Sequence, residues 1–174
     1  QAADTAMYAA KNDAPESCLG LFIEHDAQVT VRDAEDNTPL LLALEKGASP
    51  ALLGLLVAAG ADPQVRTARG RTSLMMAARS GSRETVSLLL RHGADPDSVD
   101  AEGKSALYFA AAHGSNVRVL KALLEAMDTP LETGVSPLIG ASRHNSNPKI
   151  PEALLDMNFR NHLNEQGDSG MTPL

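Results

Sequence analysis

The sequence predicts an all-α solenoid of helix-turn-helix units with projecting hairpin loops, five repeats plus the start of a sixth. Three observations lead to this prediction. A Thr/Ser-x-Leu-type segment recurs with a period near 33 residues, a second marker recurs in the same register, and the apolar residues are mostly small or aliphatic. Two markers that share one period are typical of stacked repeats, because each unit can bury its apolar face only against its neighbours.

The first marker begins with a hydroxyl residue and recurs at intervals of 33, 34, 33, 31 and 36 residues, at Thr5, Thr38, Thr72, Ser105, Ser136 and Thr172. The second marker follows at a near-constant offset, at 25–27, 60–62, 93–95 and 126–128. We expect a single array over residues 1–174, with repeats at 4–36, 37–70, 71–103, 104–134 and 135–170 and a stub at 171–174. Because both ends fall inside the repeat pattern, we infer a fragment of a longer protein.

Each repeat is expected to open with a short first helix. A threonine hydroxyl, as in Thr38 or Thr72, caps the helix, and Pro39 or Pro173 suits the first helical position, where no N–H is needed. Glycine can adopt the left-handed conformation without steric cost. We therefore expect it to end the first helices at Gly47, Gly81 and Gly114.

A second helix is expected in each unit, since apolar residues such as Val86, Leu89 and Leu90 recur at helical spacing. Pro50 is expected to start one of these helices, and Gly60 and Gly93 to stop two of them. Turn residues predict hairpins at 33–37, 67–71 and 100–104 and a shortened one near 128–130. In the fifth repeat the segment 145–151 is expected to be a loop, and Asn158 to stand in for the terminal glycine.

The composition limits the function. Hydrophobic residues make up 43 % of the chain, aromatic residues 3 %, and tryptophan is absent, which favours closely stacked helices over a β-sandwich. The net charge of -7 disfavours attraction of the whole molecule to nucleic acid or to an anionic membrane. The apolar run at 51–61 is shorter than the roughly 20 residues that cross a bilayer. Cys18 is the only cysteine, which excludes an internal disulfide and fits an intracellular location, cytoplasmic or nuclear.

The repeats resemble the ankyrin family, whose units begin Thr-Pro-Leu-His-x-Ala. The segment that carries the resemblance best runs from Gly70 through Thr72-Ser73-Leu74-Met75-Met76-Ala77-Ala78 to Gly93-Ala94-Asp95. The histidine that usually follows the leucine is replaced by Tyr8, Leu41, Met75, Tyr108 or Ile139. The resemblance implies a non-catalytic scaffold that binds another protein through hairpin tips and the ends of the first helices.

No catalytic, cofactor-binding or metal-binding motif occurs in the sequence. Cys18 is interpreted as a buried structural thiol, and His25 and His92 as residues at the ends of second helices, where a cationic ring suits the helix dipole. His113 and His144 occupy matching positions in adjacent repeats. They are interpreted as solvent-facing contact residues, with a zinc site as the alternative.

The register places several positive charges on one face of an acidic molecule. Arginine suits bidentate contacts to carboxylates and phosphates, so this face is the predicted partner-binding site, although ordinary solvated charge is the alternative. The candidate residues are Lys46, Arg69, Arg71, Arg79, Glu102, Lys104, His113, Arg143 and His144.

The sequence therefore predicts a monomeric protein-protein interaction module, with no enzyme activity and no cofactor, that binds a protein and favours an acidic segment of it. One alternative is a regulatory or substrate-recruiting segment of a larger enzyme. Nucleic-acid binding through the basic stripe is a further alternative, which the net charge and the lack of stacking aromatic residues disfavour.

Overall fold

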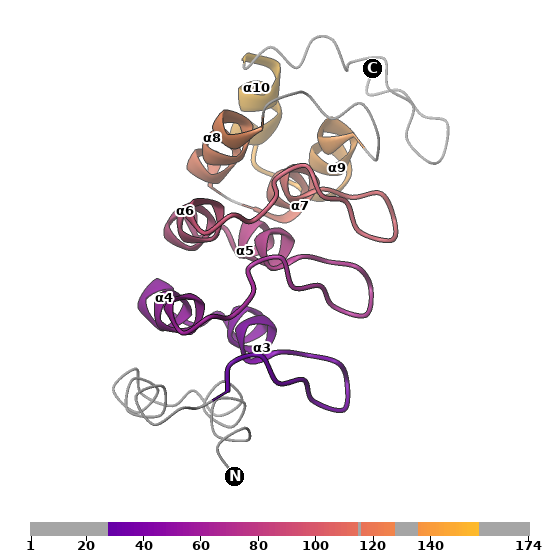
Figure 1. Cartoon of the computed structure of the whole chain (residues 1–174). Helices are drawn as coiled ribbons and strands as arrows, with labels where there is room; N and C mark the ends of the chain where they lie inside the picture. Colours follow the sequence, from indigo (N-terminus) through magenta and orange to yellow (C-terminus); the bar gives the residue numbers. More distant parts are fainter. Residues whose placement is uncertain (1–27, 115, 128–135, 157–174) are drawn as a thin grey trace.

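The computed structural model of the chain describes residues 28–114, 116–127 and 136–156. These ranges hold eight helices and no strand, which confirms the predicted all-α solenoid. The helices form two columns, with α3, α5, α7 and α9 in one and α4, α6, α8 and α10 in the other, and the hairpins project from the first column (Figure 1). The bounds are α3 Pro39–Lys46, α4 Pro50–Ala58, α5 Ser73–Ser80, α6 Arg83–Arg91, α7 Ala106–His113, α8 Val117–Ala126, α9 Pro137–His144 and α10 Lys149–Asp156.

The first helices begin as predicted. The Thr38 hydroxyl accepts a hydrogen bond from the backbone N–H of Leu41, and the Thr72 hydroxyl accepts one from Met75. Such a bond satisfies one of the donors that the first helical turn leaves without an intrahelical partner. Pro39 is the first residue of α3 and Pro50 the first residue of α4, where a missing N–H costs nothing.

The ends of the first helices agree with the prediction at two glycines and differ at a third. Gly47 and Gly81 are left-handed, with φ angles of 72° and 77°. Gly114 is extended, with φ −73° and ψ 145°, so the prediction of a left-handed end was wrong there. Glycine is still required at this position because a Cβ would lie 2.4 Å from the carbonyl oxygen of Ala110.

The fifth repeat also corrects the sequence prediction. Helix α10 begins at Lys149, so the segment 149–151 is helical and not part of a loop. Pro151 fits because it lies in the first turn, where backbone N–H groups have no intrahelical acceptor. The helical register buries Ile150 and Leu154 completely.

The core lies between the two columns of helices and between successive repeats. The first helices are buried along most of their length, and in α7 every residue from Ala106 to Ala112 is buried. The second helices are amphipathic, and α6 buries Val86 and Leu89 while exposing Arg83 and Arg91. Small and aliphatic side chains thus allow close packing in this core, in keeping with the near absence of aromatic residues.

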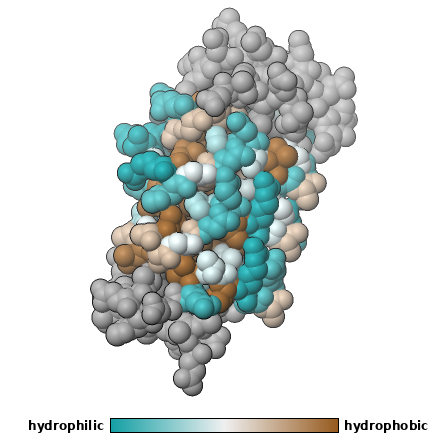
Figure 2. Space-filling model, in the orientation of Figure 1, coloured by the Kyte–Doolittle hydropathy of each residue, from teal (hydrophilic) through white to brown (hydrophobic). Residues whose placement is uncertain are grey.

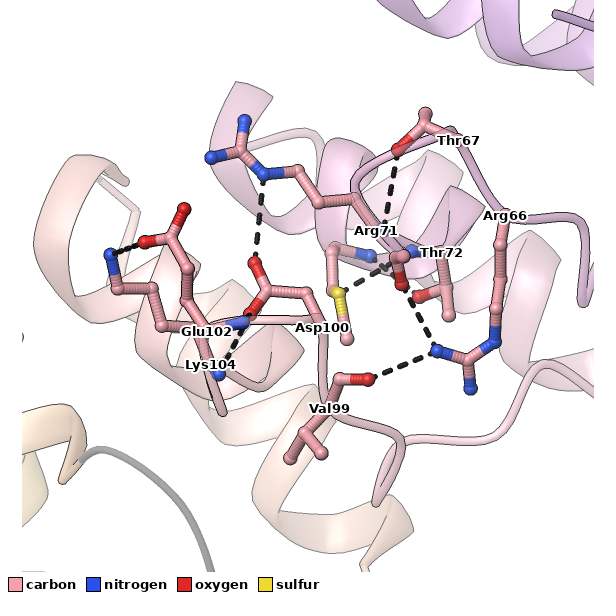
Figure 3. Close-up of polar contacts among 10 residues, drawn as sticks. Arg66, Thr67, Arg71, Thr72, Val99, Asp100, Glu102 and Lys104 are labelled. Atoms are coloured by element: carbon pink, nitrogen blue, oxygen red, sulfur yellow. Dashed lines mark hydrogen bonds and ion pairs between the residues drawn. The ribbon is translucent and has the colours of Figure 1, made fainter. Parts of the chain in front are cut away.

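The three predicted hairpins form where expected. The Asp33, Thr67 and Asp100 N–H groups donate across each turn, to the carbonyls of Asn37, Arg71 and Lys104. Neighbouring hairpins are tied together, because the Ala101 N–H donates to the Arg69 carbonyl over 3.3 Å. The Arg66 guanidinium adds bonds to the carbonyls of Gly70 and Val99, both 3.0 Å (Figure 3). The spacing between the hairpins 67–71 and 100–104 is therefore set by bonds between repeats.

Predictions for some positions lie outside the described residues. These positions are Thr5, Cys18, His25, the hairpin near 128–130, Asn158 and Thr172.

Candidate functional site

An open groove of about 710 Å³ runs between two neighbouring repeats on the hairpin side of the molecule. Its walls come from helices α3 and α5 and from the hairpins 33–37 and 67–71. Over the described residues, the face in Figure 2 is largely hydrophilic, with smaller hydrophobic areas between. The groove is lined by Glu35, Asn37, Leu41, Leu44, Glu45, Thr67, Ala68, Arg69, Arg71, Met75, Met76, Arg79, Ser80 and Phe109.

The predicted site residues divide between this groove and the surface beyond it. Arg69, Arg71 and Arg79 line the groove. Lys46 ends α3, and Glu102 and Lys104 belong to the next hairpin. The remaining three end first helices further along the stack and are exposed: His113 on α7, and Arg143 and His144 on α9.

Arg71 has an internal partner that the sequence did not reveal. Its Nε lies 3.6 Å from Oδ2 of Asp100, whose side chain is only 1 % exposed (Figure 3). Its guanidinium lies 5.0 Å from the centre of the Phe109 ring. The other Asp100 oxygen accepts hydrogen bonds of 2.9 Å from the N–H groups of Glu102 and Lys104. Arg71 is thus held in place by the next hairpin and by the Phe109 ring, and contributes more to structure than to free positive charge.

Lys104 is also partnered. Its ammonium donates to the Glu102 carboxylate and lies 5.3 Å from the centre of the Tyr108 ring. This hydrogen bond lowers the pKa of Glu102 below its ordinary value of 4.5 and raises the pKa of Lys104 above 10.5. The two charges largely cancel at this hairpin tip, so Lys104 adds little to a positive surface.

Arg69 and Arg79 differ from these two cations. Both are exposed and line the groove, and within the described part of the chain neither guanidinium forms a hydrogen bond or an ion pair. Unpaired guanidinium groups keep their full capacity for bidentate contacts to a carboxylate. The positive charge that is free for a partner at this groove therefore comes from Arg69 and Arg79.

A column of rings crosses the repeats beyond the groove. The rings of Phe109 and His113 are stacked with centroids 6.3 Å apart, and those of His113 and His144 with centroids 5.7 Å apart. The structure thus brings the two predicted histidines together. Among the described residues no cluster of three or more metal-ligating side chains surrounds them.

The pKa of His113 is lowered from its ordinary value of 6.5, first by partial burial and then by the charges of Arg79, His144, Lys104 and Arg71. The folded chain therefore favours the neutral ring, and the unfolded chain takes up a proton at higher pH. The contribution of His113 to the free energy of unfolding is fully present above pH 6.5. It is lost as the pH falls through the lower pKa that His113 has in the folded state.

We expect denaturant unfolding at pH 7.5 and pH 5 to show a smaller pH-dependent loss of stability for His113→Gln than for the wild type. His92→Gln is the control, because His92 follows α6 and is exposed. An equal loss in the wild type and His113→Gln would contradict a contribution from His113.

Sequence reasoning missed the apolar part of the groove. The floor is made by buried residues of the first helices, including Leu41, Leu44 and Met75, with the partly buried Met76 and the 3 % exposed Phe109. The sequence did hold an indication of this floor, because these residues come shortly before the ends of the first helices, where partner contacts were predicted. The indication was ambiguous, because apolar residues at helical spacing are also the pattern of an ordinary buried core.

No helix in the described ranges is long and apolar enough to cross a membrane.

A family model for ankyrin repeats in three copies matches the chain at residues 6–100 and 45–131. The two matches together extend from residue 6 to residue 131, which is well over half of the 174 residues. No curated protein matches the chain. Ankyrin repeats are generally protein-protein interaction modules and their fold is typically non-catalytic. The period, the paired helices and the family match agree, and the chain belongs to the ankyrin-repeat family.

Proposed function

We propose that this chain is a non-catalytic module that binds another protein through the face formed by its hairpin tips and first helices. The observation that carries the proposal is the open groove of about 710 Å³, which combines an apolar floor with unpaired charged side chains. Binding surfaces commonly combine an apolar centre with a polar rim. One of the two hairpins that border the groove, 67–71, is braced by the Arg66 bonds, so a partner would meet a partly preformed surface.

An acidic segment of the partner fits this surface. Arg69 and Arg79 offer two guanidinium groups without internal partners, next to the partly buried Met76. On a molecule with a net charge of -7, a local positive region steers approaching carboxylates toward itself. The proposal therefore includes electrostatic steering of an acidic partner toward α5.

Nucleic-acid binding is less well supported. Arg71 and Lys104 are engaged with Asp100 and Glu102, which removes two of the charges in the predicted basic stripe. Phe109 is only 3 % exposed and offers no face on which a base can stack.

Site-specific photo-crosslinking tests the binding face. A photoreactive residue at Ser80, which is exposed in the groove at the end of α5, should form an adduct with a partner in an extract of the source cells. Lys121 is the matched control, since it is exposed on the second helix α8. The proposed face would be wrong if the adduct formed at Lys121 as efficiently as at Ser80.

A further inference from the structure

The charges on the groove are arranged in two opposed pairs. Glu35 and Arg69 hold the same hairpin position in successive repeats, and Glu45 and Arg79 hold the same position at the ends of α3 and α5. All four side chains are exposed and all four line the groove. One wall therefore carries two carboxylates and the other carries two guanidinium groups.

These opposite charges do not neutralise each other. Within the described ranges none of the four side chains forms an ion pair or a hydrogen bond, whereas the Arg32–Asp36 ion pair closes at 3.0 Å in the same hairpin that carries Glu35. Adjacent packed helices lie about 8–10 Å apart, a distance that long side chains can bridge. The stacked rings of His113 and His144 do meet at equivalent positions of adjacent repeats, so the separation of these four charges is a feature of this groove and not of the repeat spacing alone. The groove thus has an acidic wall and a basic wall, both of which face solvent.

We infer that the groove takes a partner segment of mixed charge, with a cationic side chain at Glu35 and Glu45 and a carboxylate at Arg69 and Arg79. This inference rests on the proposed function and deepens it by naming the charge pattern of the partner. The two partner charges must be about 10 Å apart, which is about three residues of an extended chain or about seven residues of a helix. Between them, an apolar side chain lies against Met76, which is partly buried over the core.

A uniformly acidic segment fits less well. It can satisfy Arg69 and Arg79, but a segment that follows the stack also places carboxylates beside Glu35 and Glu45, and like charges in contact repel. In a uniformly acidic segment, the two exposed contacts to Glu35 and Glu45 change from attractive to repulsive. We therefore expect its Kd to be about tenfold higher than that of a mixed-charge segment. The acidic wall therefore acts as a selectivity element that rejects segments with carboxylates at both positions.

The experiment is a selection from a displayed library of random peptides on the wild type and on two variants. The wild type should enrich peptides with one basic and one acidic position flanking an apolar residue, at the spacing given above. Glu35→Arg/Glu45→Arg should enrich uniformly acidic peptides, and Arg69→Glu/Arg79→Glu should enrich uniformly basic ones. This readout does not depend on the direction in which the peptide runs.

Glu84→Arg/Glu125→Arg is the control, because it changes the net charge as much as Glu35→Arg/Glu45→Arg does. Glu84 and Glu125 are exposed on the second helices α6 and α8, so this variant should still enrich mixed-charge peptides. A synthetic mixed-charge peptide should bind the wild type about tenfold more tightly than its uniformly acidic counterpart. All variants should keep the wild-type thermal melt, because every substituted side chain is exposed.

The outcomes separate this inference from the proposed function. If the wild type enriches uniformly acidic peptides that crosslink at position 80, the binding face stands and the mixed-charge inference is overturned. If the selected peptides keep their charge pattern in both wall variants, the walls do not select them and the inference is overturned as well. If no peptides are enriched, or if they crosslink at position 121 instead, both proposals fail.

Discussion

Replacing Leu89 with alanine should lower the free energy of unfolding by about 2–5 kcal/mol. Leu89 lies in α6 and is completely buried in the core, in a helix that packs against α4, α5 and α8. Removing three carbon atoms there loses their transfer free energy and leaves a cavity that the surrounding first and second helices fill only in part. The damage should also uncouple the two ends of the array, because repeats are stabilised by their nearest neighbours.

Urea unfolding followed by circular dichroism would measure the change. Leu55→Ala is the matched control: Leu55 lies in the second helix α4, but it is 38 % exposed. We expect a loss of about 1 kcal/mol or less for this control, since less apolar surface returns to water. If Leu89→Ala lowered the free energy of unfolding by less than about 0.5 kcal/mol, Leu89 would not be a residue that stabilises the core.

Reversing the charges of Arg69 and Arg79 to glutamate should slow association with the partner by about tenfold or more at low salt. Both guanidinium groups line the groove, and among the described residues neither of them has an ion-pair or hydrogen-bond partner. The double variant makes both groove walls acidic, so the field that attracts a carboxylate becomes repulsive. The thermal melt should stay within about 0.5 kcal/mol of the wild type, because both residues are exposed.

Binding rates across a salt series would test this prediction with the partner that crosslinks at position 80. Arg83→Glu/Arg118→Glu is the control, because it makes the same change in net charge on exposed residues of the second helices α6 and α8. This control should bind at nearly the wild-type rate. Salt-independent association, or equal slowing in both double variants, would leave Arg69 and Arg79 as solubilising surface residues only.

The features that the sequence predicted correctly depend on residues close together in the chain. Thr38 and Thr72 cap their helices through bonds that span three residues, and Gly47 and Gly81 end helices by their own conformational freedom. The hairpins likewise close over four residues. The burial of Leu89 followed from helical spacing within one repeat. The period of about 33 residues then determined how such units stack.

The features that the sequence did not predict are two local backbone conformations and one contact between hairpins. Gly114 is extended, and α10 begins at Lys149, although the turn residues nearby suggested otherwise. Arg71 looked like a free charge, but the structure shows that Asp100 of the next hairpin is its partner.

What the sequence by itself determined is therefore the fold, the repeat register and the side chains that face the hairpin side. Only the tertiary structure decided which of those charges remain available. It pairs Arg71 with Asp100, yet it leaves Glu45 and Arg79 apart on opposite walls of one groove. The reason is that local bonding follows from residue type and spacing, whereas the distance between charges 34 positions apart depends on how neighbouring repeats pack.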